Sequence, residues 1–300
     1  MSYWKIGGLL ENSFFPTSLE SLIFLVTKLH ELNEKFIIVG KSSNLLFTSE
    51  YIRGIVIFLG ENFSNIEELS PRCFRVLAGT SVPWMCYVMG ARGYSGVEHC
   101  IGIPGSLGGL IYMNGGSNRK AIGEVVTKVT AINAETGKLL KLSRNECGFS
   151  YRKSFFQDTN LLIISADIEL VLRPSKEVKK EMLYILKSRK NKFPLNFPNC
   201  GSVFKSSPEI YKKYGPPGKI IEDMGLKGTT IGGASISEKH ANFIINHYKA
   251  TSEEVFEIIN LITQEFYKKS GLFIRTEVSY VDSSCNIINL SEYMSEIEQH

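Results

Sequence analysis

Residues 96–116 read GVEHCIGIPGSLGGLIYMNGG and hold seven of the 26 glycines of this 300-residue chain. Because glycine has no side chain, backbone N–H groups in such a stretch can approach an anion closely and surround it. Pro104 and Ser106 precede a possible helix start at Leu107, where a helix N-terminus adds partial positive charge. The stretch predicts either an anion-binding loop or a set of tight turns in a loop-rich fold.

A second loop of this kind, VGKSSN at residues 39–44, directly follows an apolar run of strand length at 36–39. Two such loops suit the two phosphates of a dinucleotide. Two common nucleotide motifs are excluded. The chain contains no G-x-G-x-x-G, and a P-loop ending at Gly40-Lys41-Ser42 would need a glycine where Lys35 stands.

The composition is that of an ordinary globular protein, with 43% hydrophobic and 21% charged residues. A formal net charge of +4 is too small to indicate nucleic-acid binding. No apolar stretch reaches the roughly 18 residues of a membrane span, and the N-terminus lacks a signal-peptide pattern. The six irregularly spaced cysteines predict reduced thiols and no zinc site. We therefore expect a cytoplasmic protein without a metal and without a nucleic-acid or membrane partner.

Periodicity, capping and turn signals predict interleaved helices and strands in an α+β arrangement of more than one domain. A capping box at Thr17 and Glu20 and another at Thr251 and Glu254 mark two helix starts, and Gly271 marks a helix end. Five prolines between 194 and 217 predict a loop-rich entry to a further domain, and no pattern is evident after Asp282. The expected elements are helices at 17–33, 82–89, 174–192 and 251–270, strands at 36–39, 54–59, 73–77, 161–171 and 272–281, and a hairpin of 126–133 with 138–142.

Seven segments, in this order, resemble the UDP-N-acetylenolpyruvoylglucosamine reductase (MurB) family, the flavoenzymes of peptidoglycan precursor synthesis. Each segment alone is a weak signal, but together they are specific and span roughly residues 3–281. The segments are IVGKSSNLL (38–46), GIPGSLGG with MNGG (102–109 and 113–116), FSYRKS (149–154), NCGSVFK (199–205), GLKG (225–228), SEKHANF (237–243) and IRTEV (274–278).

The resemblance implies a PCMH-type, vanillyl-alcohol-oxidase-like FAD-binding fold with a C-terminal α+β substrate-binding domain. The expected FAD-binding subdomains are residues 1–49 and 50–175, followed by the substrate domain at 176–283 and a tail at 284–300. The region between Phe156 and Pro198 has no room for the insertion of the longer subclass. The chain therefore resembles the shorter, type II form.

The resemblance also implies non-covalent FAD, with the two glycine loops holding its pyrophosphate. The family's first loop usually has three consecutive glycines, whereas here Lys41 and Ser42 replace two of them, so that Lys41 either crowds the pyrophosphate or pairs with it. His99 and Cys100 stand where apolar residues are usual. The implied FAD-binding residues are Val39, Gly40, Lys41, Ser42, Ser43, Asn44, Leu45, Ile103, Pro104, Gly105, Ser106, Gly108, Gly109, Asn114 and Gly115.

The implied reaction reduces UDP-N-acetylglucosamine enolpyruvate to UDP-N-acetylmuramate, with NADPH as the reductant of FAD. Hydride addition at C3 of the enolpyruvyl group drives negative charge toward C2 and the carboxylate, so the site needs a cation and an acid. By resemblance Arg152 is the carboxylate-binding cation, Ser202 the proton donor and Glu277 the completing carboxyl group. The implied substrate-binding residues are Arg189 and Lys192, which would contact phosphate, with Lys205 and Tyr151.

Structural roles remain open for several of these residues. Ser202 could be a turn residue, Arg152 a structural ion-pair partner, Glu277 an exposed strand carboxylate and Tyr151 a packing residue, while His240 reads as a buried structural histidine. Two other functions also remain open. One is a family paralogue that reduces another unsaturated nucleotide sugar, motivated by Lys41, Ser42, His99, Cys100 and Ser206. The other is a flavin-binding protein without turnover. We expect a monomer.

Overall fold

The computed structural model describes residues 2–297, which fall into two compact units. The N-terminal unit comprises Ser13–Lys41 and Ile55–Arg189. The C-terminal unit comprises Ser42–Gly54 and the described residues of 1–12 and 190–300. Because the chain passes between the units several times, each unit is assembled from separated segments. The predicted cuts after residues 49, 175 and 283 stay a prediction.

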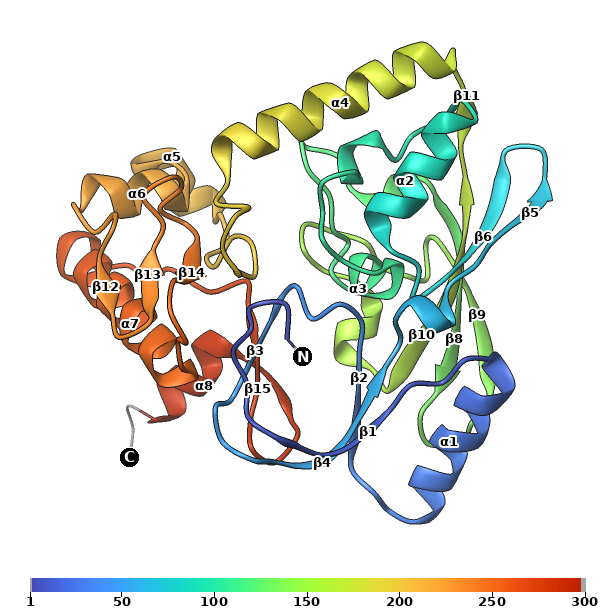
Figure 1. Ribbon diagram of the computed structural model, residues 1–300, viewed down its shortest axis with the longest axis horizontal. Coiled ribbons are helices and arrows are strands. Elements are labelled where there is room, and N and C mark those ends of the chain that lie inside the picture. The colour runs from blue at the N-terminus through green and yellow to red at the C-terminus, as the bar shows by residue number, and fades with distance from the viewer. Residues whose placement is uncertain (1, 298–300) are drawn as a thin grey trace. The chain divides into compact units, whose positions relative to one another are not determined.

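The N-terminal unit is built on a five-stranded antiparallel sheet in the order β5-β6-β10-β8-β9 (Figure 1). Six consecutive residues of the central strand β10, at 163–168, are buried. A strand buried without alternation is covered on both faces, and α3 (Leu107–Tyr112) packs against β10. The strands are β5 (Ile66–Ser70), β6 (Cys73–Leu77), β8 (Val126–Asn133), β9 (Leu139–Ser143) and β10 (Leu161–Glu169).

Helices and short strands surround this sheet. Gly90 lets α2 (Val82–Ala91) approach α4 (Ser175–Lys192) closely, because a Cβ at Gly90 would lie 2.3 Å from Cε of Met182. The strands β1 (Leu10–Phe14) and β4 (Ile52–Phe58) have residues in both units and form a separate three-stranded sheet with β2 (Phe36–Val39), which runs parallel to β4. The other elements are α1 (Leu19–Glu31), β7 (Tyr94–Ser95), which pairs with β11 (Val171–Leu172), and the 3-10 turns Glu61–Phe63, Glu98–Cys100, Ile122–Glu124 and Phe155–Asp158.

The C-terminal unit contains two three-stranded sheets and four helices. In one sheet β15 (Ser279–Val281) pairs with β3 (Leu45–Phe47) in parallel and with β16 (Ile287–Asn289) in antiparallel orientation. The other is the antiparallel set β12 (Thr230–Ile231), β13 (Ala234–Ile236) and β14 (Ile244–Asn246), against which α7 (Ser252–Ser270) packs. The remaining helices are α5 (Pro208–Tyr214), α6 (Pro217–Asp223) and α8 (Leu290–Ile297).

Most of the expected elements are confirmed. The hairpin appears as β8 and β9, the basic segment as α4, and the short helix after the glycine loop as α3. The side chain of Thr251 accepts a hydrogen bond from the N–H of Glu254 at the start of α7, and Gly271 ends that helix with a φ of 69°. Local signals of this kind act within one helical turn, so they can be read from the sequence.

Four expectations are wrong in detail. The cap of α1 is Ser18, which pairs with Ser21, rather than Thr17 with Glu20. Only Ser279–Val281 of the segment 272–281 forms a strand, because β3 and β16 offer pairing partners only there. The proline-rich segment contains α5 and α6, each with a proline in its first turn, where the missing N–H costs nothing. The patternless tail contains β16 and α8.

In the described part of the chain, no helix is long and apolar enough to cross a bilayer. The described residues include all six cysteines; these form no disulfide, and five of them are buried.

Candidate active site

The structure divides the predicted site residues between the two units. The N-terminal unit holds Val39, Gly40, Lys41, Ile103, Pro104, Gly105, Ser106, Gly108, Gly109, Asn114, Gly115, Tyr151, Arg152 and Arg189. The C-terminal unit holds Ser42, Ser43, Asn44, Leu45, Lys192, Ser202, Lys205 and Glu277.

The two glycine loops meet within the N-terminal unit. β2 ends at the buried residue Val39, and the next residue is Gly40. A Cβ at Gly40 would lie 2.0 Å from Oγ of Ser106, so glycine is what allows the loops to approach this closely. At Gly109 a Cβ would have only Ser106 Oγ within 4 Å, at 3.8 Å. The paired loops therefore leave one open, side-chain-free position beside hydroxyl groups, which fits a phosphate-bearing ligand.

The N-terminus of α3 supplies fewer free donors than the sequence suggests. The N–H of Leu107 donates to the carbonyl of Thr80 at 2.9 Å, and the N–H of Gly108 donates to the carbonyl of Ala78 at 2.8 Å. These two hydrogen bonds connect the glycine loop to the residues that directly follow β6. These two N–H groups are therefore already hydrogen-bonded within the protein, and anion binding by the glycine loop stays a prediction.

Lys41 and Ser42 replace glycines in different ways. Ser42 has a φ of 52°, a left-handed conformation that glycine adopts most easily. Its Oγ accepts a hydrogen bond from the N–H of Tyr3 at 2.8 Å, which stabilises this conformation. The Nζ of Lys41 lies 3.7 Å from Oε1 of the exposed Glu61, an ion pair of the kind that contributes little in water. Among the ion pairs of the described residues, the ammonium group of Lys41 therefore has only this weak partner.

Arg152 lies in a tight turn held by polar side chains. It has a φ of 56°, and the turn is closed by backbone hydrogen bonds between Ser150 and Lys153. The side chain of Asn114 donates to the carbonyl of Ser150 at 2.7 Å, and that of Gln157 donates to the carbonyl of Arg152 at 3.1 Å. Such conformations persist where surrounding contacts enforce them and are frequent at functional sites. Asn114 thus links the glycine stretch to the arginine turn, a role that the sequence motif did not reveal.

Arg152 and Arg189 both lie close to the glycine stretch. Nη2 of Arg152 is 3.5 Å from the carbonyl oxygen of Gly116. A Cβ at Gly102 would lie 2.2 Å from Cδ of Arg189, so the arginine stem passes directly over that glycine. Burial raises the pKa of the Cys100 thiol, and the charges of both arginines oppose this rise, which places the two guanidinium groups around the same residue. The N-terminal unit therefore gathers two cations beside the loops.

His99 and Cys100 occupy the core rather than an open surface. Both are buried, and burial lowers the pKa of His99 so that the imidazole is neutral at pH 7. Nearby Glu98 fixes the start of the stretch, because its carboxylate accepts the N–H of Gly96 at 2.7 Å and lies 3.5 Å from Nη1 of Arg173. Burial alone would raise the pKa of Glu98, but hydrogen bonds from Ser95 and Gly96 and the charge of Arg173 leave it below its ordinary value.

In the C-terminal unit, Ser202, Lys205 and Glu277 lie on two adjoining extended segments. The N–H of Glu277 donates to the carbonyl of Val203 at 2.7 Å, and the N–H of Lys205 donates to the carbonyl of Arg275 at 2.9 Å. Burial raises the pKa of the Cys200 thiol, and the charge of Glu277 raises it further. The backbone register thus brings the predicted proton donor and the predicted carboxyl group together.

Asn242 holds the backbone of the segment that carries Ser202 and Lys205, although its sequence motif alone indicated no such role. Its Oδ1 accepts the N–H of Phe204 at 2.9 Å, and its Nδ2 donates to the carbonyl of Phe204 at 3.0 Å. It belongs to the motif at 237–243, which was the only available signal. His240, in the same motif, accepts the N–H of Asn242 at 3.3 Å and contacts the rings of both Phe193 and Phe243, which stack on each other. These contacts fit the structural role that was expected for His240.

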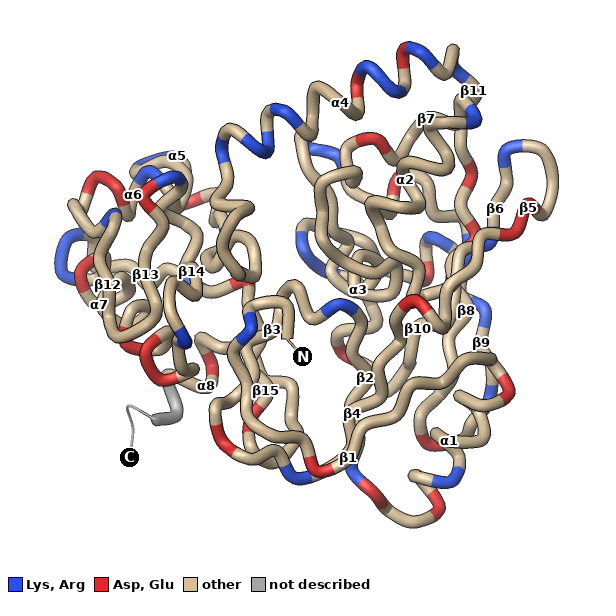
Figure 2. Tube along the Cα trace, viewed as in Figure 1, with Lys and Arg blue, Asp and Glu red and all other residues tan. Residues whose placement is uncertain are grey.

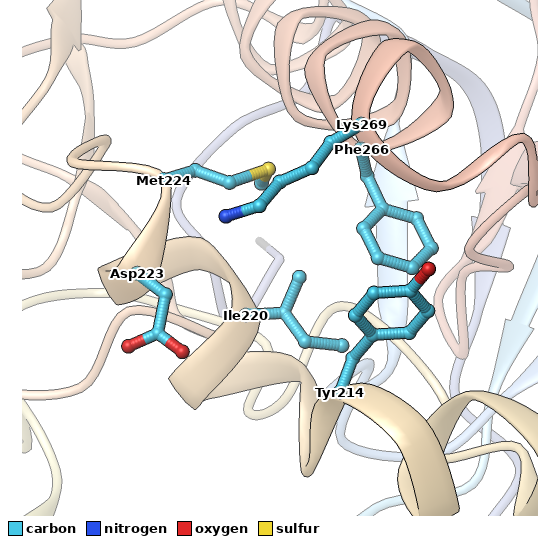
Figure 3. A pocket seen from close by; sticks show the side chains of 6 residues that line it. All are labelled: Tyr214, Ile220, Asp223, Met224, Phe266 and Lys269. Atoms are coloured by element: carbon cyan, nitrogen blue, oxygen red, sulfur yellow. The ribbon is translucent and has the colours of Figure 1, made fainter.

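The C-terminal unit also contains a small cavity, which none of the predicted site residues lines. Its volume of about 30 Å³ has room for water and not for a nucleotide sugar. Tyr214 and Phe266 contact edge to face in its wall (Figure 3). The lining residues are Tyr214, Ile220, Asp223, Met224, Phe266 and Lys269.

Two families of known proteins match this chain, one over most of the N-terminal part and one over the C-terminal part. Residues 12–143 match the FAD binding domain family, and residues 193–281 match the C-terminal domain of UDP-N-acetylenolpyruvoylglucosamine reductase. UDP-N-acetylenolpyruvoylglucosamine reductase 1 of Corynebacterium glutamicum is 41% identical over 286 residues, which cover 95% of this chain and 84% of the relative. The reductase of Prochlorococcus marinus is 34% identical, with 92% of each chain covered.

A solved structure leads to the same family. The crystal structure of UDP-N-acetylenolpyruvylglucosamine reductase (MurB) from Thermus caldophilus superposes with a TM-score of 0.76 at 26% identity. The match covers 93% of this chain and 95% of that one. The resemblance inferred from the sequence motifs and the predicted FAD-binding fold are confirmed. This chain belongs to the UDP-N-acetylenolpyruvoylglucosamine reductase (MurB) family.

Proposed function

We propose that this protein is an FAD-dependent reductase that converts UDP-N-acetylglucosamine enolpyruvate to UDP-N-acetylmuramate with NADPH as co-substrate. The observation that carries the proposal is the pairing of the Ser202 segment with the Glu277 segment, inside the part of the chain that matches the reductase C-terminal domain. The family membership supports the same reaction and the use of FAD. The activity belongs to peptidoglycan precursor synthesis.

The residues of the N-terminal unit fit the cofactor. The loops at 39–41 and 102–109 combine an open glycine position, hydroxyl groups and the Lys41 ammonium group, a donor set suited to a pyrophosphate. We propose that these loops hold the FAD pyrophosphate together with Ser43, Asn44 and Leu45. When bound, FAD supplies the hydride that reaches C3 of the enolpyruvyl group after reduction by NADPH.

The chain's own residues would manage charge and the proton. The guanidinium of Arg152 would bind the enolpyruvyl carboxylate, where negative charge increases as C3 is reduced. The hydroxyl of Ser202 would deliver a proton to C2. A serine hydroxyl is a weak acid in water, so it needs a fixed position and a strongly basic acceptor. The turn at Gly201 and the two hydrogen bonds between Asn242 and the backbone of Phe204 would fix the position of Ser202. The carboxyl group of Glu277 would polarise the reaction intermediate.

Cations would hold the nucleotide sugar. Arg189 lies over Gly102 near the glycine stretch, and Lys192 follows it at the exposed end of α4. We propose that both contact the substrate phosphates, with Lys205 beside the reacting group. Tyr151 is 65% exposed, and its ring lies 5.4 Å from the Arg152 guanidinium carbon, so it can both orient the arginine and contact substrate.

An anaerobic half-reaction tests the proposal. The protein is reduced with one equivalent of NADPH and then mixed with UDP-N-acetylglucosamine enolpyruvate, while flavin absorbance is followed. Rapid reoxidation is expected. Ser202→Ala should accept electrons from NADPH at the normal rate and reoxidise far more slowly, because only proton delivery is lost. A wild-type flavin that stays reduced in the presence of substrate would overturn the assignment.

The structure weakens the main reasons for another substrate. Ser42 is accommodated by the N–H of Tyr3, and His99 and Cys100 are buried in the core. We infer that these three departures do not by themselves call for another substrate. Reduction of another unsaturated nucleotide sugar remains the alternative, and a comparison of flavin reoxidation rates between sugar substrates would decide it. We also propose a cytoplasmic location, because buried thiols that form no disulfide suit a reducing compartment, and, as expected from the sequence, a monomer.

A further inference from the structure

Helix α4 has one face packed against the N-terminal unit. With 3.6 residues per turn, Val178, Met182 and Ile185 share a face, and all three are buried. Met182 and Val178 contact the position of Gly90 in α2. Arg189 lies on the same side, over Gly102. Packing and the proposed substrate contact therefore account for this side of the helix.

On the opposite side of α4 the apolar side chains are exposed. Leu183 is 65% exposed and Tyr184 is 74% exposed, and Leu186 is also exposed. Lysines lie before and after these apolar side chains at helical spacing, and all of them are exposed. We call this surface the α4 outer face, and it consists of Lys176, Lys179, Lys180, Leu183, Tyr184, Leu186 and Lys187.

The α4 outer face carries charge of one sign. The two carboxylates of the helix, Glu177 and Glu181, lie to one side and pair with Arg173 at 3.8 and 2.8 Å. Figure 2 shows Lys and Arg positions along the length of α4, with acidic positions confined to the end nearer β11. The face is therefore a strip of four lysines around an exposed Leu-Tyr pair.

We propose that the α4 outer face docks this protein on an anionic phospholipid surface. Helices with a lysine-rich face and exposed Leu or aromatic side chains lie in the membrane interface, where lysine stems extend around the apolar groups. The same face of a second copy would be repelled, so a symmetric dimer through this face is disfavoured. A specific protein partner is less well matched, because lysine is depleted and arginine enriched in protein–protein interfaces.

The chemistry of lysine also favours this occupant. A lysine ammonium group is a compact charge on a flexible stem, suited to a diffuse array of lipid phosphates, whereas bidentate recognition of single groups uses arginine. Each lysine near an anionic bilayer contributes on the order of 1 kcal/mol, which is about fivefold in partitioning. This inference concerns surface docking and goes against the expectation that the protein has no membrane partner, which rested on the absence of a spanning segment. It does not depend on the proposed catalytic roles.

Vesicle co-sedimentation tests the docking surface. The FAD-loaded protein is mixed with vesicles of pure phosphatidylcholine or of phosphatidylcholine with roughly one-third phosphatidylglycerol, at low and at high NaCl. Binding is expected only with the anionic vesicles, and it should weaken at high salt. The double variant Lys180→Glu/Lys187→Glu should lower partitioning by at least about 25-fold, from about fivefold for each of the two lysines lost.

Two matched variants make the test specific. Lys212→Glu/Lys213→Glu reverses two exposed lysines on α5 and should bind the anionic vesicles nearly as the wild type does. Leu183→Ser/Tyr184→Ser keeps the charge but should reduce binding at high salt, where the apolar contribution dominates. Unchanged flavin reduction by NADPH in every variant shows that the fold is intact.

Three results would overturn the proposal. The first is wild-type protein that fails to sediment with anionic vesicles at low salt. The second is equal binding by the α4 and α5 variants. The third is α4-dependent binding to fluorescent polyglutamate without binding to anionic vesicles, which would identify an acidic protein surface as the partner.

Discussion

Gly116→Ala should destabilise the N-terminal unit because no space exists for the added methyl group. A Cβ at Gly116 would lie 1.9 Å from the carbonyl oxygen of Lys120 and 2.7 Å from Cα of Ala121. Both are backbone atoms, so no side-chain rotation can relieve the contact, and the 116–121 turn must move by more than 1 Å to restore an ordinary separation, roughly 3.4 Å or more. Overpacking of this kind costs about 1–3 kcal/mol.

The matched control is Gly109→Ala in α3. A Cβ there has only Ser106 Oγ within 4 Å, at 3.8 Å, and alanine is favoured over glycine inside a helix by up to about 1 kcal/mol. The FAD-free fold should therefore be as stable as the wild type or slightly more so. If Gly109 faces the FAD pyrophosphate as proposed, the same methyl group should weaken FAD binding.

Urea unfolding with and without saturating FAD separates the two effects. Gly116→Ala should lower the unfolding free energy of the FAD-free protein by about 1–3 kcal/mol. Gly109→Ala should keep that free energy but lose part of the stabilisation that FAD adds, since a ligand stabilises in proportion to its affinity. The reasoning is refuted if Gly116→Ala is as stable as the wild type. It is equally refuted if Gly109→Ala is less stable while FAD affinity is unchanged.

Three further predictions follow from single contacts. Lys41→Gly should weaken FAD binding and flatten its salt dependence in fluorescence titrations; unchanged affinity would mean that the ammonium group does not pair with the pyrophosphate. Asn242→Ala removes both hydrogen bonds to Phe204, and it should lower the unfolding free energy by about 1–3 kcal/mol and slow flavin reoxidation by substrate more than flavin reduction by NADPH. The folded-state pKa of Glu98 lies below its ordinary value of 4.5, so its stabilising contribution is present above that pH and is lost as the pH falls through the folded value; Glu98→Gln should flatten the acid limb of the stability curve, and an unchanged limb would contradict the assignment.

The motifs in the sequence located the main parts of the site but not the groups that hold them. The loops at 39–44 and 102–116 were evident because glycines and hydroxyls in such spacing have a direct backbone meaning. The hydrogen bonds from the N–H groups of Leu107 and Gly108 to the carbonyls of Thr80 and Ala78 could not be predicted, because the acceptors lie almost 30 residues earlier in the chain. The hydrogen bonds between Asn242 and Phe204 could not be predicted for the same reason, because the two residues are 38 positions apart.

The secondary structure also contains elements that could be predicted from local signals and elements that could not. The helices with local caps and periodic apolar faces, such as α7 and α4, were predicted close to their observed bounds, since their hydrogen bonds join residues four apart. The segment 272–281 was predicted as one strand, yet only Ser279–Val281 forms a regular strand, and Thr276 makes an isolated bridge with Phe204. A regular strand exists only where another segment supplies a continuous row of donors and acceptors.

By itself, the sequence determined the family, the FAD-binding fold class, the positions of the glycine loops and the identities of the candidate chemical groups. Tertiary structure decided which segments pair, which donors remain for a ligand and why Ser42 is tolerated at a left-handed position. The physical reason is range. Caps, turns and helical periodicity act over a few neighbouring residues, whereas strand pairing, burial and side-chain brackets depend on partners that only the folded chain brings together.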